Sequence, residues 1–148
     1  MNLRTAHVEA TCDETGFEHR RVSVREALGG ELIGCTLYEF DAGAQLWPYH
    51  LHWGNEEWLV VVAGAPTLRT PDGERTLREG DVVGFPQGEP GAHTLYNRTD
   101  EPVRLAIFST LRHGTVVYPD SGKVGAGPPH DRRYFRSSDA VDYWEEER

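Results

Sequence analysis

Four residues of the kinds that bind metals, His50, His52, Glu57 and His93, lie in the middle of this 148-residue chain. His50 and His52 are two positions apart, a spacing that on an α-helix turns their side chains about 200° away from each other. On a β-strand the same spacing places both side chains on one face. Two imidazoles and a nearby carboxylate are ligands that first-row transition metals accept. The pattern therefore predicts a metal site, provided that the surrounding chain forms β-structure.

The acid of this site has two candidates, because Glu56 and Glu57 are adjacent and only one of them can face inward on an extended chain. Alternation from either acid passes through apolar positions only. These positions are Leu59, Val61 and Ala63 for Glu57, and Trp58, Val60 and Val62 for Glu56. Alternation alone therefore leaves both acids as candidate ligands.

The region between residues 32 and 110 has the pattern of short strands separated by turn residues. The expected strands are residues 32–40, 45–52, 58–62, 67–70, 74–78, 82–85, 94–97 and 103–109. Asp72-Gly73, between two of them, is typical of a β-hairpin turn. No segment of this region has the 3.6-residue apolar period of a helix, so we expect an antiparallel sandwich or barrel.

Two motifs in this region resemble those of the cupin superfamily. The first is a glycine, His-x-His, a glutamate and, after six residues, another glycine; its members here are Gly43, His50, His52, Glu57 and Gly64. The second is a glycine, Pro-x-Gly, a histidine and an asparagine; its members are Gly80, Pro86, Gly88, His93 and Asn97. Six residues separate Glu57 from Gly64, so the motif selects Glu57 over Glu56. Extra residues before His50 and His93 fall in expected loops, which tolerate changes of length.

The resemblance implies an all-β fold, the antiparallel jelly-roll barrel (double-stranded β-helix) of cupins. We expect the barrel over about residues 30–112 of a single domain, 1–148, with irregular extensions at 1–29 and 113–148 that pack on it. A helical turn is expected at residues 24–28. The resemblance also implies a homodimer, in which a partner covers aromatic side chains outside the barrel such as Trp58 and Tyr96.

A short helix is expected near the C-terminus, beginning at Ser138 or Asp139. Ala140, Tyr143 and Trp144 would share one face of it. We expect the two aromatic residues to dock this segment or a second subunit.

The resemblance further implies that His50, His52, Glu57 and His93 point into the barrel and hold one divalent transition metal ion. Iron, manganese, nickel, zinc and copper all fit such ligands. Burial of these side chains would be costly without a partner of this kind. Aromatic and polar residues near the motif and in the tail are candidate substrate contacts. They are Trp47, Tyr49, Tyr118 and Lys123.

These features favour a metal-dependent enzyme that acts on a small organic molecule. An ion with open coordination positions in a small apolar pocket suits dioxygenase-type chemistry or isomerase and lyase chemistry. The alternative is a non-catalytic module that binds or senses a small molecule or a sugar, because one fold serves many functions.

The composition of the chain limits its possible partners and its cellular location. The formal net charge of −9 argues against nucleic-acid binding, which needs clustered basic residues. No apolar run is long enough to cross a membrane, and the first residues lack the apolar core of a signal peptide. Two cysteines, Cys12 and Cys35, are expected to be reduced. We therefore expect a cytoplasmic protein.

Overall fold

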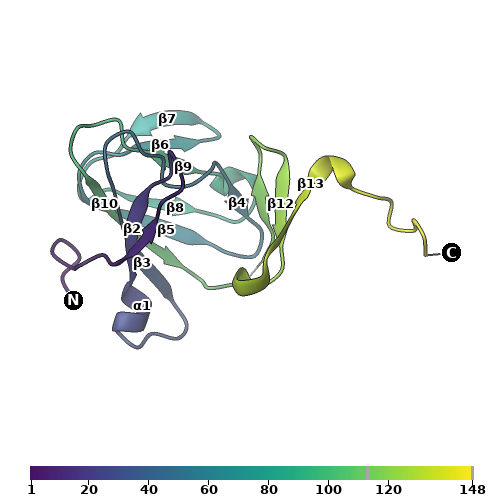
Figure 1. The fold of residues 1–148 in the computed structure, drawn as a ribbon, viewed down its shortest axis with the longest axis horizontal. Helices are drawn as coiled ribbons and strands as arrows, with labels where there is room; N and C mark the ends of the chain where they lie inside the picture. Colours follow the sequence, from purple (N-terminus) through teal and green to yellow (C-terminus); the bar gives the residue numbers. More distant parts are fainter. Residues whose placement is uncertain (113, 148) are drawn as a thin grey trace.

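The computed structural model describes residues 1–112 and 114–147, and most of its regular structure is antiparallel β-sheet (Figure 1). The largest sheet has six strands. In spatial order they are β1 (Ala10–Cys12), β2 (His19–Ser23), β3 (Gly34–Phe40), β10 (Val103–Ser109), β5 (Glu57–Ala63) and β8 (Val82–Phe85). Seven of the eight expected strands of the barrel region are present with ends that differ by at most two residues. The expected strand 45–52 is reduced to β4 (Leu51–His52), and the chain before it makes only isolated bridges at Gln45 and His50.

Two smaller sheets complete the fold. The first contains β7 (Gly73–Thr76), β6 (Thr67–Thr70) and β9 (Thr94–Tyr96). The second contains β13 (Arg133–Arg136), β12 (Lys123–Ala126), β11 (Val116–Tyr118) and β4 (Leu51–His52). The segment before β4 joins them through the bridges Gln45↔Tyr96 and His50↔His93. The smaller sheets thus form a second wall of the jelly-roll barrel.

The core lies between these walls, and its residues alternate along the strands as expected for a half-buried sheet. Leu59 and Val61 on β5, Leu105 on β10, and Leu68 and Leu95 on the opposite wall are essentially inaccessible to solvent. Because side chains two apart share a strand face, the first residue of β5 points into the same interior.

The N-terminal extension is not irregular as expected, because β1 and β2 extend the six-stranded sheet beyond β3. Backbone pairing and ion pairs hold these strands, with Val22 as the one β2 side chain packed against a buried apolar cluster, so alternation could not reveal them. Arg20 on β2 forms ion pairs with Glu39 (3.0 Å) and Asp41 (2.8 Å). The helical turn predicted after β2 is present as α1 (Val24–Ala27), with Ser23 as its N-cap.

The C-terminal extension is also more regular than expected. β11 pairs with β4, and an ion pair of 2.6 Å between Arg69 on β6 and Asp120 fixes the β11–β12 hairpin on the barrel. A short 3₁₀ turn, η2 (Pro129–Asp131), then leads into β13.

The expected C-terminal α-helix is wrong. The structure has only the 3₁₀ turn η3 (Ser137–Asp139), after which the tail runs away from the barrel (Figure 1). Tyr143 is 81% exposed and Trp144 56%. A helix this short is unstable in water unless its apolar face is packed against other structure, and these side chains remain largely in solvent.

The remaining expectations concern the surface and the cysteines. Trp58 is 56% exposed outside the barrel, and Tyr96 is half-buried beneath the guanidinium of Arg98. Cys12 and Cys35 are both free thiols. Within the described ranges, no helix has the length and apolar character needed to cross a bilayer.

A glycine before β9 offers a test of how the fold places His93. Gly91 closes the 3₁₀ turn η1 (Glu89–Gly91), and a Cβ atom there would lie 1.8 Å from the carbonyl oxygen of Pro86. We expect Gly91→Ala to lower the free energy of unfolding by about 1–3 kcal/mol, the usual cost of overpacking. Urea denaturation measures this change.

The matched control is Gly84→Ala on β8, where an added Cβ has its nearest neighbours, atoms of Trp58, at 3.8 Å. This substitution is expected to leave the unfolding midpoint nearly unchanged. Equal midpoints for the two variants would contradict the packing described here.

Candidate metal centre

The two walls of the barrel bring the candidate ligands together. His50 directly precedes β4 and His52 ends it, Glu57 opens β5, and His93 directly precedes β9. His50 and His93 are paired across two segments by reciprocal backbone hydrogen bonds of 3.1 and 2.8 Å. Directly opposed residues have neighbouring side chains on one face, and the two imidazole ring centres are 4.7 Å apart.

Glu57, not Glu56, faces this centre. Glu57 shares the inner face of β5 with the buried residues Leu59 and Val61. Glu56 is exposed and accepts a hydrogen bond from the indole of Trp58 (3.0 Å) on the outside. The packing of β5 thus decides between the two acids that alternation left open.

Hydrogen bonds fix the orientation of two imidazoles. His50 Nδ1 lies 2.8 Å from the Pro48 carbonyl oxygen, and His93 Nδ1 lies 2.8 Å from that of Gly91. A carbonyl oxygen only accepts, so each Nδ1 carries the hydrogen and each Nε2 keeps its lone pair. The Nε2 atom of His93 is buried and has no hydrogen-bond partner among the described residues. Such a lone pair suits a metal ion.

Glu57 completes the cluster. Its Oε2 atom lies 3.3 Å from His52 Nε2 and 3.6 Å from His93 Nε2. Its other oxygen, Oε1, accepts a hydrogen bond of 3.1 Å from Asn55, whose own oxygen accepts one of 3.0 Å from Thr110. Contacts of this type hold a ligand side chain in one orientation.

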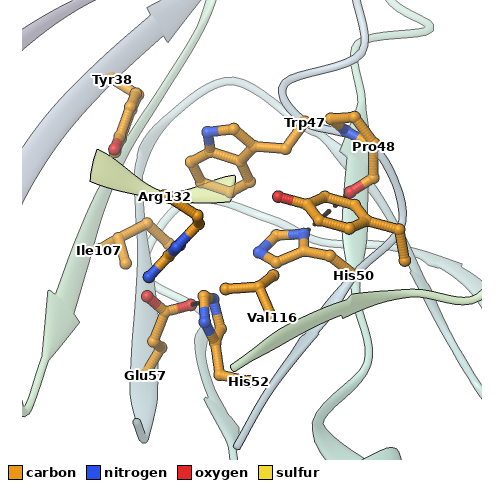
Figure 2. Close-up of a pocket in the computed structure, with 10 residues that line it drawn as sticks. Tyr38, Trp47, Pro48, His50, His52, Glu57, Ile107, Val116 and Arg132 are labelled. Atoms are coloured by element: carbon orange, nitrogen blue, oxygen red, sulfur yellow. Dashed lines mark hydrogen bonds and ion pairs between the residues drawn. The ribbon is translucent and has the colours of Figure 1, made fainter. Parts of the chain in front are cut away.

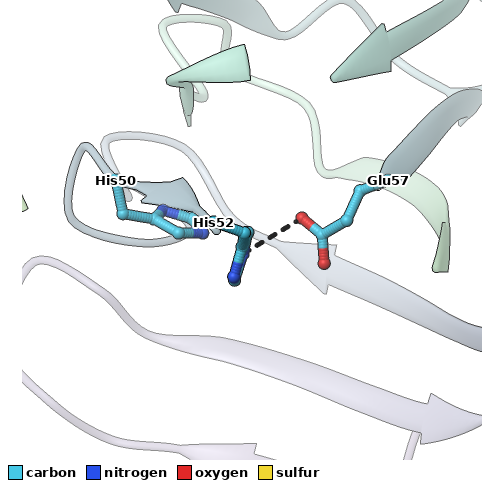
Figure 3. A group of neighbouring side chains, drawn as sticks. All are labelled: His50, His52 and Glu57. Atoms are coloured by element: carbon cyan, nitrogen blue, oxygen red, sulfur yellow. Dashed lines mark ion pairs between the residues drawn. The ribbon is translucent and has the colours of Figure 1, made fainter. Parts of the chain in front are cut away.

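One group of three candidate ligands is especially compact. Ligand atoms of His50, His52 and Glu57 all lie within 4.8 Å of one another (Figure 3). Atoms bound to one ion at about 2.0–2.2 Å would be somewhat closer together, so only small side-chain rotations are needed. His93 is outside this tightest group but contacts Glu57 within it. The four residues predicted from the sequence are therefore neighbours, and three of them, His50, His52 and Glu57, form a group that could hold a metal ion.

The protonation states also suit a metal. Burial, with further contributions from His93 and His52, lowers the pKa of His50 to about 3. Burial likewise lowers the pKa of His93. Burial alone would raise the pKa of Glu57, but the hydrogen bond with His52 and the neighbouring imidazoles lower it overall. At neutral pH, His50 and His93 are thus neutral and Glu57 is ionised, as metal ligands must be.

A cavity of about 250 Å³ opens beside the candidate ligands (Figure 2). Its lining comes from both walls and from the C-terminal extension. The lining residues are Tyr38, Trp47, Pro48, His50, His52, Glu57, Ile107, Val116, Tyr118 and Arg132. At about 30 Å³ per water molecule in the liquid, the cavity holds only a small molecule.

Two of the four predicted substrate contacts line this cavity. The indole of Trp47 stands edge-on to the rings of His50 and His93, and the ring of Tyr118 lies 6.0 Å from that of His50. Burial and the neighbouring Tyr134 raise the pKa of Tyr118 to about 12. Its hydroxyl therefore stays protonated and able to donate at neutral pH.

The other two predicted contacts lie elsewhere. Tyr49 packs with Leu51 and Ala92 behind the cavity wall, beneath the guanidinium of Arg69 at 4.0 Å. It is next to His50 on an extended segment, so its side chain points to the opposite face. Lys123 extends over the ring of Tyr118, with Nζ 5.3 Å from the ring centre, and is not among the lining residues.

Sequence reasoning missed Tyr38, Val116 and Arg132 in the cavity. Tyr38 lies on β3 and the other two belong to the C-terminal extension. Alternation along β3 could have suggested Tyr38, which shares a strand face with the buried residue Phe40. Arg132 had no local signal, because its position depends on how the extension folds back.

Comparison with known proteins agrees with this architecture. A family model described as the cupin domain matches residues 36–111, about half of the chain. The chain therefore belongs to the cupin family.

Solved structures with the same fold extend beyond that region. A proposed sugar phosphate isomerase from Acidithiobacillus ferrooxidans is 26% identical, with a TM-score of 0.79 over 86% of this chain and 81% of that one. A sugar phosphate isomerase of the cupin superfamily from Silicibacter pomeroyi is 22% identical, with a TM-score of 0.81 over 98% of this chain and 97% of that one. The fold similarity to the second protein thus includes both terminal extensions.

A further relative differs in kind. The beta subunit of a Rhodococcus nitrile hydratase is 34% identical over 106 residues. The alignment covers 68% of this chain and 44% of that subunit, so the chain spans less than half of the relative's length.

Metal analysis tests the four ligands directly. We expect the purified protein to bind about one equivalent of a divalent transition metal, and a His50→Ala/His93→Ala variant to retain less than about a tenth of it, because two of four ligands are lost. Elemental analysis after dialysis gives the ratio.

His7→Ala is the control. His7 is exposed in the N-terminal segment, so this substitution removes an imidazole without affecting the cluster. Equal metal content in the double variant and the unmodified protein would refute the assignment.

The lowered pKa of His50 predicts a pH dependence of the metal-free protein. Unfolding releases His50 to its ordinary pKa of 6.5, so between pH 7 and 5 the unfolded chain gains a proton that the folded protein excludes. The melting temperature should therefore fall across this range, and fall less in His50→Gln. Thermal unfolding of chelator-treated protein measures it. An equal decrease of the melting temperature in the unmodified protein and in His50→Gln would contradict the role of His50. The control His7→Gln should show the same decrease as the unmodified protein.

Proposed function

We propose that this cupin is a metal-dependent enzyme that acts on a small organic molecule, with His50, His52, Glu57 and His93 as ligands of one divalent transition metal. The observation that carries the proposal is the buried Nε2 atom of His93, which faces Glu57 without a hydrogen-bond partner among the described residues. A buried polar atom without a partner is costly, and an ion bound there would remove that cost. Iron, manganese, nickel, zinc and copper all remain compatible with the ligand set.

A bound ion would act as a Lewis acid on a substrate oxygen or, if it were iron, support oxygen chemistry. The protein's own groups set the conditions around it. Asn55 holds the Glu57 carboxylate, and Ile107 and Val116 keep part of the cavity apolar. The Tyr118 hydroxyl stays protonated at neutral pH, because its pKa is raised to about 12.

Among the two reaction types, we favour isomerase or lyase chemistry. The 26% identity to a proposed sugar phosphate isomerase, over most of both chains, supports this choice. One observation favours oxygen chemistry instead: among the described residues, Glu57 is the only carboxylate in the cavity lining, so no second acid stands ready as a general base.

A second candidate function is a non-catalytic module that binds a small molecule. The 34% identity to part of a nitrile hydratase beta subunit favours it, because that relative is one subunit of a larger enzyme. The two candidates differ in one measurable property, which is turnover.

The proposal also covers the oligomeric state, the cellular location and the partners of the protein. We propose a homodimer in the cytoplasm that acts on a small molecule and binds neither nucleic acid nor a membrane. The net charge of −9 supports the absence of nucleic-acid binding, and the exposed Trp58 on the outer sheet supports the dimer. Light scattering at micromolar concentration would measure the dimer.

Activity of matched metal forms tests the proposal. Protein reloaded with iron, zinc or manganese is incubated with a panel of small hydroxy acids, keto acids and sugar phosphates, while product formation and oxygen uptake are followed. We expect turnover with at least one metal and a loss of at least about a hundredfold in the chelator-treated protein, because the proposed chemistry requires the ion. Turnover that survives complete metal removal would defeat the metalloenzyme, and stoichiometric binding without conversion would establish the binding module.

A further inference from the structure

Arg132 is the cavity residue whose chemistry the metal centre does not use. It follows η2 and projects from the C-terminal extension into the cavity, above Glu57 and His52 in Figure 2. Its Nε atom is buried without a hydrogen-bond partner in the described part of the chain. The only hydrogen bond that its side chain makes with the described residues, from Nη2 to the Gly114 carbonyl oxygen, is long at 3.4 Å.

The other partly buried arginines among the described residues are all paired with acids. Arg20 binds Glu39 at 3.0 Å, Arg25 binds Glu26 at 3.4 Å, Arg69 binds Asp120 at 2.6 Å, and Arg104 binds Glu39. In the described ranges, Arg132 has no carboxylate oxygen within 4.0 Å. A guanidinium always carries its charge and its fork of donors, so one turned into a cavity without an acid is suited to bind an anion from outside.

The charge of the cavity points the same way. Glu57 and Arg132 are the lining residues that carry opposite charges at neutral pH, and they offset each other. A divalent ion on the proposed ligands would leave the cavity with two net positive charges. A low-dielectric cavity with an excess of positive charge attracts anions.

We propose that Arg132 binds the carboxylate or phosphate group of an anionic substrate, while another oxygen of that substrate faces His50, His52 and Glu57. The position of the second substrate oxygen rests on the proposed metal centre, whereas the binding of the anion by Arg132 does not. Arg132 presents two parallel N–H groups, the geometry that carboxylates and phosphates bind in pairs. The cavity volume of about 250 Å³ restricts the substrate to a small acid or phosphate ester.

Calorimetry with simple anions tests this subsite. Malonate and inorganic phosphate are titrated into metal-loaded and metal-free protein, and malonamide serves as the uncharged counterpart of malonate. We expect Arg132→Gln to bind both anions at least tenfold more weakly than the unmodified protein, with unchanged metal content. Arg132→Lys keeps the charge but loses the fork, so its affinity should lie between the two.

Arg133→Gln is the matched control. It removes the same charge from the neighbouring position, whose side chain is exposed at the start of β13, and should change the affinities by less than twofold. Circular dichroism and melting temperatures of all variants verify that each is folded.

The outcomes separate the two proposals. If Arg132→Gln binds malonate and phosphate as tightly as the unmodified protein, or if malonamide binds as tightly as malonate, the anion subsite is refuted, whatever the metal content. If the unmodified protein holds no metal but binds the anions, and Arg132→Gln is the one variant that does not bind them, the metal centre is refuted and the subsite stands. Equal losses in Arg132→Gln and Arg133→Gln would reduce the effect to net charge and overturn the subsite.

Discussion

The reciprocal backbone hydrogen bonds between His50 and His93 are the constraint on which the site depends. They join the segment before β4 to the segment before β9, and so connect the two smaller sheets into one wall. The same pairing sets both imidazoles side by side on the inner face. Local carbonyl groups of Pro48 and Gly91 then fix each ring through its Nδ1 atom. The same hydrogen bonds therefore close the barrel wall and orient the candidate ligands.

This arrangement is unfavourable for the protein without a ligand. His50 and His93 are buried in their neutral forms, and the Nε2 atom of His93 has no partner in the described structure. A fold that excludes protons from these rings gives up stability as the pH falls. Binding an ion to the native state alone would return that stability by mass action. The burial of this polar cluster is therefore better explained by ligand binding than by a structural role in the core.

The sequence predicted the barrel and the proximity of the four candidate ligands, because both follow from short-range patterns. Alternation and turn residues located the strands, and the first glycine-framed motif selected Glu57 where alternation left Glu56 open. Elements held by long-range contacts escaped prediction. β1 and β2 depend on the free edge of β3 and on ion pairs of Arg20, and Arg132 depends on the return path of the C-terminal extension. The C-terminal helix failed because amphipathic spacing alone cannot supply a surface for its apolar face to pack against.

The division between barrel and extension also explains how one fold can serve different chemistries. The family match ends at residue 111, and it includes all four candidate ligands. Val116, Tyr118 and Arg132 lie beyond it, yet they line the same cavity because β11 pairs with β4 next to His52. In the function that we propose, the barrel holds the ion, whereas the extension supplies groups that surround a molecule bound beside it. The groups that we propose to determine specificity then lie in the segment that the sequence motifs do not cover.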